Sequence, residues 1–239
     1  MKKALVTGGS GGIGSAICRR LAADGCHVYI HTNSGLRGAQ ALADAVCADG
    51  GSAEVLVFDV TDAAAVANVL VPLVAEQPIQ ILVNNAGIHD DVVFPGMRAE
   101  QWHRVMDVSV NGFFNVTQPL MMPMIRSRWG RVINVSSIAA LTGNPGQVNY
   151  SAAKGALNSA TKSLAREVAS RGITVNAVAP GIIDTPMSRS AFDAAEIARL
   201  VPMKRAGSPA EVADLIGFLA SPAAAYITGQ IVSINGGMI

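Results

Sequence analysis

The chain has 239 residues, half of them apolar, and its 18 basic and 17 acidic side chains leave a net charge of +1. This composition supplies a continuous hydrophobic core, and it excludes the basic arms with which proteins bind nucleic acid or anionic membranes. No apolar run approaches the roughly 20 residues of a membrane span, and the run after Lys3 ends too soon for an export signal. We therefore expect a folded, cytoplasmic protein.

Short β-branched runs alternate with longer helical patterns along most of the chain. Strands are expected over residues 4–7, 27–30, 54–58, 79–83, 131–135 and 173–178, and helices over 13–23, 36–48, 63–75, 99–128 and 148–170. The alternation predicts a parallel sheet with right-handed crossovers, and the nearly continuous apolar strands indicate a sheet covered on both faces. The expected fold class is α/β, a Rossmann-type doubly wound sheet of about seven strands in one domain spanning residues 1–239.

Two features lie outside this regular pattern. Residues 180–207 are irregular and contain several prolines, which is typical of a lid that moves over a site. The cysteines Cys18, Cys26 and Cys47 are odd in number and lack Cys-x-x-Cys spacing. We therefore expect three small buried hydrophobes rather than disulfides or a metal site.

A glycine-rich turn connects the first expected strand to the first expected helix. Glycine lets the backbone approach a diphosphate closely, and the free N–H groups at the helix start stabilise its charge. An ordinary turn is the alternative, but the position between a strand and a helix favours a dinucleotide. The residues expected to bind it here are Thr7, Gly8, Ser10, Gly12, Ile13 and Gly14.

The second expected strand ends without the acidic residue that would bind a ribose 2′-hydroxyl and repel a 2′-phosphate. The chain instead has Thr32 and Asn33, with Arg37 shortly after. Hydroxyl groups and a guanidinium suit a phosphate, so NADP is favoured over NAD. The alternative is a solvated loop.

Two further motifs follow the third and fourth expected strands. Asp59 and Val60 lie where an adenine ring would pack, although Asp59 is equally suited to cap the next helix. Asn85, Ala86 and Gly87 follow the fourth strand at the topological switch point, where small residues let a ligand come close. The alternative for this motif is an ordinary strand-exit turn.

Tyr150 and Lys154 lie four residues apart in an expected helix and therefore share one face. A tyrosine hydroxyl has a pKa of about 10, and a nearby ammonium lowers it toward neutrality. Tyr150 is then a general acid that protonates a carbonyl oxygen while hydride reaches the carbon. Ser137, after the fifth strand, would hold the same oxygen, and Asn111 would bind a water that resupplies the proton through Lys154.

These motifs together resemble the short-chain dehydrogenase/reductase family. The resemblance rests on Thr7-Gly8-x-x-x-Gly12-x-Gly14, Asn84-Asn85-Ala86-Gly87, Asn111, Ser137, Tyr150-x-x-x-Lys154 and Pro180-Gly181. It implies that Tyr150 and Lys154 also contact the nicotinamide ribose. It further implies that Pro180, Gly181 and Ile183 line the nicotinamide, and that Thr185 holds the carboxamide or a phosphate.

Within that family the chain is most similar to bacterial 3-oxoacyl-(acyl carrier protein) reductases, through residues 146–154, 163–176 and 234–237. The resemblance implies NADPH-dependent reduction of a 3-oxoacyl thioester. It also implies a homotetramer joined through residues 99–128, residues 148–170 and the C-terminal strand, and carrier docking at Arg128 and Arg171. Two solvated surface charges are the alternative for these arginines.

The chain also departs from that group. Gly11 stands where NADP-preferring members carry a basic residue, which counts against NADP. Residues 88–95 add acids near the site, and with residues 118–125 they resemble reductases of aryl polyene pathways. A dehydrogenase of small alcohols, sugars or steroids and a non-catalytic NADP sensor are the alternative functions, the second opposed by the intact Asn111, Ser137, Tyr150 and Lys154.

Overall fold

The centre of the protein is a sheet of seven parallel strands in the order β3-β2-β1-β4-β5-β6-β7. The computed structural model describes residues 1–189 and 192–239. The strands are β1 (Lys3–Val6), β2 (His27–Thr32), β3 (Ser52–Val57), β4 (Ile81–Asn84), β5 (Gly130–Val135), β6 (Ile173–Pro180) and β7 (Ile231–Ile234). The predicted doubly wound fold is confirmed.

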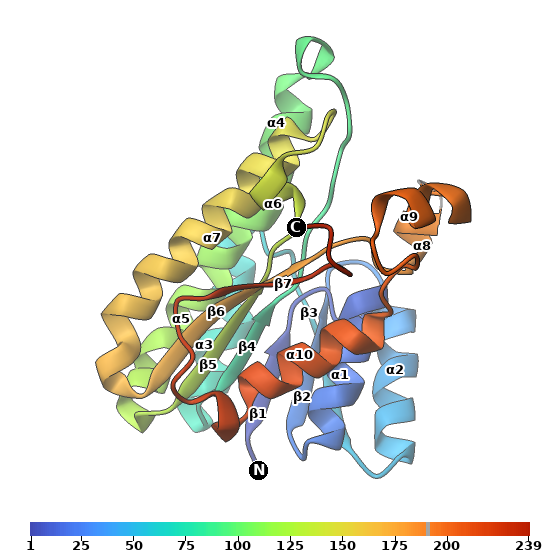
Figure 1. Ribbon diagram of the computed structural model, residues 1–239. Coiled ribbons are helices and arrows are strands. Elements are labelled where there is room, and N and C mark those ends of the chain that lie inside the picture. The colour runs from blue at the N-terminus through green and yellow to red at the C-terminus, as the bar shows by residue number, and fades with distance from the viewer. Residues whose placement is uncertain (190–191) are drawn as a thin grey trace.

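Helices cover both faces of the sheet (Figure 1). One layer consists of α1 (Gly12–Ala23), α2 (Leu36–Ala48) and α10 (Pro209–Ala220), and the other of α3 (Ala63–Glu76), α5 (Gly112–Ser127) and α7 (Val148–Val168). Neighbouring strand residues point to opposite layers, as Leu5 and Val6 do, and both are fully buried. This burial on both faces explains why the strands have no polar alternation.

The strand order reverses between β1 and β4, which lie side by side with Val6 paired to Val83. The glycine turn after β1 and the turn after β4 are therefore neighbours at the carboxyl edge of the sheet. Open α/β sheets bind ligands in the crevice at such a reversal. The fold thus brings together two motifs that lie more than seventy residues apart in the chain.

The long helix expected over residues 99–128 is interrupted. It consists of α4 (Ala99–Met106), a π-helical turn η2 (Asp107–Asn111) and then α5. A π turn inserts an extra residue into the helical hydrogen-bond ladder, a feature that periodicity does not reveal. It changes which side chains of residues 107–111 face the sheet.

The remaining elements are short: η1 (Phe94–Gly96), α6 (Ala139–Thr142), η3 (Ala169–Arg171), α8 (Pro186–Arg189), α9 (Ala194–Leu200) and η4 (Pro222–Ala224). The expected lid over 180–207 contains α8 and α9, and its residues 190 and 191 lie outside the described residues. Cys18 and Cys26 are buried as expected, but Cys47 is exposed near the end of α2, which corrects that prediction. Within the described chain, no helix is both long and apolar enough for a membrane span.

Candidate active site

The glycine turn is shaped by contacts that leave no space for side chains. Gly8 has a φ of 61°, in the left-handed region, and a Cβ on Gly14 would lie 2.2 Å from the Gly8 carbonyl oxygen. A Cβ on Gly12 would lie 3.1 Å from Thr185 Cγ2, so the segment after β6 approaches the turn directly. The structure therefore brings the predicted Thr185 against the predicted glycine turn.

The start of α1 is suited to an anion. Its N-cap residue is Gly11, no described side chain caps its first turn, and that turn contains no acidic residue. The first backbone N–H groups of a helix lack intrahelical partners and carry partial positive charge. Gly12, Ile13 and Gly14 therefore offer donors to a diphosphate, and the residues present fit a dinucleotide.

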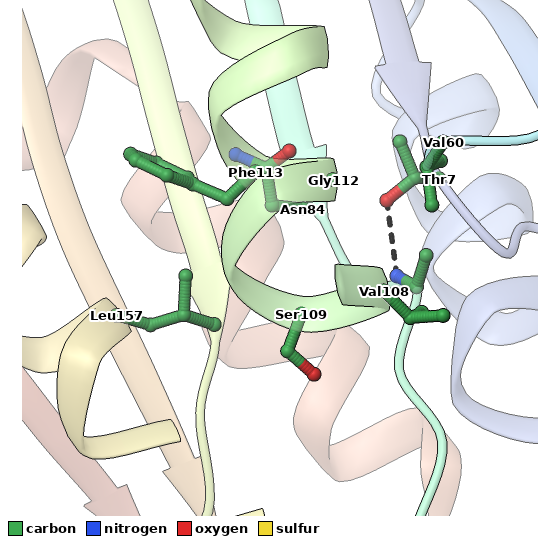
Figure 2. A pocket seen from close by; sticks show the side chains of 9 residues that line it. Thr7, Val60, Asn84, Val108, Ser109, Gly112, Phe113 and Leu157 are labelled. Carbon is green, nitrogen blue, oxygen red and sulfur yellow. Dashed lines mark hydrogen bonds between the residues drawn. The ribbon is translucent and has the colours of Figure 1, made fainter. Parts of the chain in front are cut away.

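Thr7 and Asn85 support this turn from within. Thr7 Oγ1 accepts hydrogen bonds from the N–H groups of Asn85 and Ala86, both at 3.0 Å, and Figure 2 shows the second of these. Asn85 Nδ2 donates to the carbonyl oxygens of Thr7 and Gly8 at 2.9 and 3.0 Å. Both side chains are thus used to join the two turns, a role that the sequence did not reveal.

The three residues predicted to hold a 2′-phosphate lie at and after the end of β2, and they differ in their exposure to solvent. Thr32 is only 4% exposed, and its hydroxyl oxygen accepts from Ser10 Oγ at 3.3 Å and from Gly35 N at 3.0 Å. The Thr32 side chain thus helps to shape the loop, and its contact with a phosphate stays a prediction. Asn33 and Arg37 are exposed and face solvent, as a phosphate site requires.

Asp59 is held by the loop that follows β3. Its carboxylate accepts from Thr61 N and Thr61 Oγ1, both at 2.8 Å, and from Asn33 Nδ2 at 3.3 Å. The bond from the Thr61 backbone is the main reason that the pKa of Asp59 lies below its ordinary value. The N-cap of α3 is Asp62, so the capping alternative for Asp59 does not hold.

Ser137 and Tyr150 meet at the carboxyl edge of the sheet. Ser137 follows β5, Tyr150 lies in the first turn of α7, and the Ser137 hydroxyl lies close enough to Tyr150 to affect its pKa. Burial raises the pKa of Tyr150, the Ser137 hydroxyl lowers it, and the Asp91 carboxylate raises it. The sequence predicted that Lys154 lowers this pKa, but the pKa is raised and Lys154 is not among the groups that shift it.

Lys154 lies beneath this pair. Its Nζ donates to the Val135 carbonyl oxygen at 2.8 Å, lies 5.7 Å from the centre of the Tyr150 ring, and belongs to a side chain only 2% exposed. Burial lowers the pKa of Lys154 to about 8. A Cβ on Gly87 would lie 3.0 Å from Nζ, so the turn after β4 packs directly on the ammonium. The predicted Tyr150 and Lys154 do share one face of α7.

The π turn contains the predicted Asn111 and a second polar residue. The Asn111 side chain is exposed and its amide donates to Asp107 Oδ1 at 2.7 Å, and its binding of a relay water stays a prediction. Ser109 is instead 2% exposed, and its hydroxyl finds no hydrogen-bond partner among the described residues. It lines a cavity of about 10 Å³ with Thr7, Asn84, Ala86 and Leu157, the size of one water molecule (Figure 2). The sequence signal that could have identified Ser109 is that it is a second polar residue, besides Asn111, in an apolar helical stretch.

The segment after β6 completes the crevice. The Pro180 carbonyl oxygen accepts from Ile138 N at 2.9 Å, and Gly181 N donates to the Ile234 carbonyl oxygen at 2.9 Å. Ile183 is buried and forms an isolated β-bridge with Gly207. Pro180 and Gly181, two of the predicted nicotinamide-lining residues, therefore lie between the Ser137 loop and the C-terminal strand.

Comparison with known proteins agrees with this geometry. The profile of a family described as enoyl-(acyl carrier protein) reductase matches residues 8–239. The 3-oxoacyl-[acyl-carrier-protein] reductase of Escherichia coli K12 is 46% identical over 99% of this chain and 97% of its own length. The enzymes of that name from Aggregatibacter actinomycetemcomitans and Synechocystis are 44% and 43% identical, covering 98% and 99% of this chain and 98% and 96% of their own. The chain belongs to the short-chain dehydrogenase/reductase family.

The mouth of this dehydrogenase/reductase site is built from the acidic segment that the sequence singled out. Asp91 accepts from Gln147 Nε2 at 2.7 Å and contacts His89 Nδ1 at 2.9 Å. Asp90 accepts from Gln101 Nε2 at 2.7 Å and forms an ion pair with Arg104 at 3.4 Å. These contacts fasten the segment to α4 and to the start of α7, next to Tyr150. Among the described residues, no cluster of His, Cys, Asp and Glu is suited to a metal ion.

Proposed function

We propose that this protein reduces a 3-oxoacyl thioester on acyl carrier protein to the 3-hydroxyacyl thioester, with NADPH as cofactor, in the cytoplasm. The observation that carries the proposal is that the Ser137 and Tyr150 hydroxyl groups are neighbours and that the buried ammonium of Lys154 lies 5.7 Å from the centre of the Tyr150 ring. Two neighbouring hydroxyl donors suit a carbonyl oxygen. The names of relatives that span nearly the whole chain support the same substrate class.

Each side chain has a distinct role in this proposal. Bound NADPH supplies the hydride that reaches the carbonyl carbon. The raised pKa keeps the Tyr150 phenol protonated, so Tyr150 delivers its proton to the carbonyl oxygen while Ser137 shares the developing negative charge. Lys154 binds the nicotinamide ribose through its buried ammonium, which lies 5.7 Å from the centre of the Tyr150 ring. A buried water held near Ser109, or one bound by Asn111 at the surface, resupplies the proton.

The direct test is NADPH oxidation with an acetoacetyl thioester. The expected result is turnover, with weak or no activity on the unsaturated crotonyl thioester, which an enoyl reductase would prefer. Faster turnover of small alcohols, sugars or steroids would favour the second oxidoreductase function. No turnover of any of these at high protein concentration, with NADPH still bound, would favour the non-catalytic sensor.

We also propose a homotetramer, which the distribution of apolar side chains supports. Phe114 and Met122 on α5 are more than half exposed, and so are Tyr226 and Ile239 near the C-terminal strand. Exposed apolar residues on two separate faces are typical of subunit contacts. Sedimentation measurements on the wild-type chain and on Phe114→Lys would test the α5 contact.

The proposed docking of the carrier protein at Arg128 and Arg171 depends on the homotetramer. Arg128 and Arg171 are exposed, and the Arg128 guanidinium donates to the Ser170 carbonyl oxygen at 3.4 Å. They lie at the amino ends of β5 and β6, whereas Tyr150 lies at the opposite end of α7, whose 21 residues span about 30 Å. A docked carrier therefore serves the active site of a neighbouring subunit.

Charge reversal tests this docking. Arg128→Glu and Arg171→Glu are expected to raise KM for a carrier-bound substrate about tenfold, because each reverses a contact with an acidic partner. KM for the same acyl group on a small thiol should stay unchanged. Equal effects on both substrates would contradict docking.

We further propose conjugated aryl acyl chains as the preferred substrates. The support is an apolar rim beside the acidic segment, where Val93 and Phe94 are 66% and 61% exposed. A flat conjugated chain can pack on such side chains. A higher kcat/KM for aryl-conjugated than for saturated 3-oxoacyl thioesters is the expected result, and equal values would contradict it.

A further inference from the structure

We propose that His31 is a positioning residue of the dinucleotide site: its neutral ring holds Gly8 in place, and cofactor affinity falls when the ring is protonated. The inference rests on the proposed NADPH cofactor but not on the substrate. It concerns a residue outside the predicted site, at the point where β2 passes behind the glycine turn.

The ring of His31 is held on both sides. Gly8 N–H points at Nδ1, with 3.1 Å between the nitrogens, and Nε2 lies 2.9 Å from the Phe58 carbonyl oxygen. The ring packs on the Phe58 ring with 4.0 Å between centroids, and the residue is only 2% exposed. The His31 backbone takes part as well, because its carbonyl oxygen accepts from Gly9 N at 2.8 Å.

These two contacts define one protonation state. A backbone N–H can only donate, so Nδ1 must present its lone pair to Gly8. A carbonyl oxygen can only accept, so Nε2 must carry the hydrogen that points at Phe58. The ring is therefore the neutral Nε2–H tautomer. Protonation would place a second N–H on Nδ1, directly against the N–H of Gly8.

Loss of the Gly8 contact would disturb the part of the turn that approaches the diphosphate. Gly8 has a left-handed backbone, and its carbonyl oxygen accepts from Asn85 and lies where any Gly14 side chain would have to go. A shift of Gly8 therefore displaces the start of α1, whose N–H groups are the anion donors. Neutral His31 thus prepares the turn for its ligand.

The surroundings of the ring favour the neutral form. The glycine turn presents backbone groups to it, and β3 with the residues after it presents the Phe58 ring and the Asp59 carboxylate. Burial lowers the pKa of His31, while the Phe58 contact and Asp59 oppose that shift more weakly. Protonation is therefore expected below the ordinary value of 6.5.

The test is the dissociation constant of NADPH from neutral to mildly acidic pH, compared between the wild-type protein, His31→Asn and His31→Gln. The amide oxygen of Asn can take the place of Nδ1 and accept from Gly8, but it does not titrate. The longer Gln reaches toward Phe58 instead and leaves Gly8 without its acceptor. The 2′-phosphate of NADPH also titrates, but equally for all proteins, so only differences between them are interpreted.

The wild-type dissociation constant is expected to rise by up to about tenfold per pH unit below the pKa of His31, beyond the rise seen with His31→Asn. At neutral pH, His31→Gln should bind about fivefold to tenfold more weakly than His31→Asn, the effect of one hydrogen bond. His103→Asn, at an exposed histidine of α4, is the control and should follow the wild-type curve. Circular dichroism of the same samples verifies folding.

Parallel wild-type and His31→Asn curves, or equal affinities of the Asn and Gln variants, would overturn the inference while leaving the proposed function intact. Failure of the wild-type protein to bind NADPH at neutral pH would overturn both.

Discussion

The Lys154 ammonium donates a hydrogen bond to the carbonyl oxygen of Val135 at 2.8 Å, and not to the Tyr150 hydroxyl. Val135 is the last residue of β5. This bond joins the start of α7 to the strand that leads into Ser137. Because the ammonium is buried, its charge is costly to the fold and yet lies 5.7 Å from the Tyr150 ring, where the proposed chemistry needs it.

Tyr150→Phe removes the proposed general acid with little change in shape. The expected result is a loss of about 10² to 10⁴ in kcat for the acetoacetyl thioester. The dissociation constant of NADPH should change little, because the phenyl ring keeps its packing. Activity close to that of the wild-type protein would contradict the assigned role.

Asp91→Asn should move the pH dependence of reduction. Burial raises the pKa of Tyr150 and the Asp91 carboxylate raises it further, so the neutral amide lets that pKa fall. Since reduction needs the protonated phenol, the alkaline limb of kcat/KM moves to lower pH. Asp90→Asn is the matched control, because the Asp90 carboxylate is paired with Arg104. An unmoved limb in Asp91→Asn would refute the electrostatic link.

Lys154→Met should abolish turnover and stabilise the fold. Burial lowers the pKa of Lys154 from 10.5 to about 8, so the folded protein binds this proton more weakly than the unfolded chain. Wild-type stability therefore rises with pH between about 8 and 10.5. Near neutral pH the variant should be about 1–3 kcal/mol more stable by urea unfolding, and the difference should shrink across that window. A less stable variant at neutral pH would show that the Val135 bond outweighs the cost of burying the charge.

Ser109→Ala and Asn111→Ala distinguish the two polar residues of the π turn. The Ser109 hydroxyl is buried beside the cavity, so its loss should lower kcat on the order of tenfold if a water there resupplies the proton. Asn111 is exposed, and its loss should change kcat by no more than about twofold. A larger loss of kcat in Asn111→Ala than in Ser109→Ala would instead assign the proton relay to Asn111.

Much of the architecture was predictable because it depends on local pattern. Residues 36–48 were predicted as a helix and form α2 with those bounds. Their apolar residues recur with helical spacing, and Asp49-Gly50 directly after them is typical of a helix end. The spacing of Tyr150 and Lys154 was likewise sufficient to predict that they share one face of a helix, because residues four apart along a helix lie on the same side. The bounds of β4 differ from the prediction by up to two residues, because apolar flanks blur the ends of a strand.

The amino-acid sequence by itself determined the order of strands and helices, the glycine turn and the pairing of Tyr150 with Lys154. Tertiary structure decided which side chains are buried and what they contact: it buried Thr32 and Ser109, exposed Asn111 and Cys47, and placed His31 against Gly8. The reason is physical. Periodicity reports the face on which a residue lies, whereas the hydrogen-bond partner and the pKa of a side chain depend on atoms from distant segments that only packing brings together.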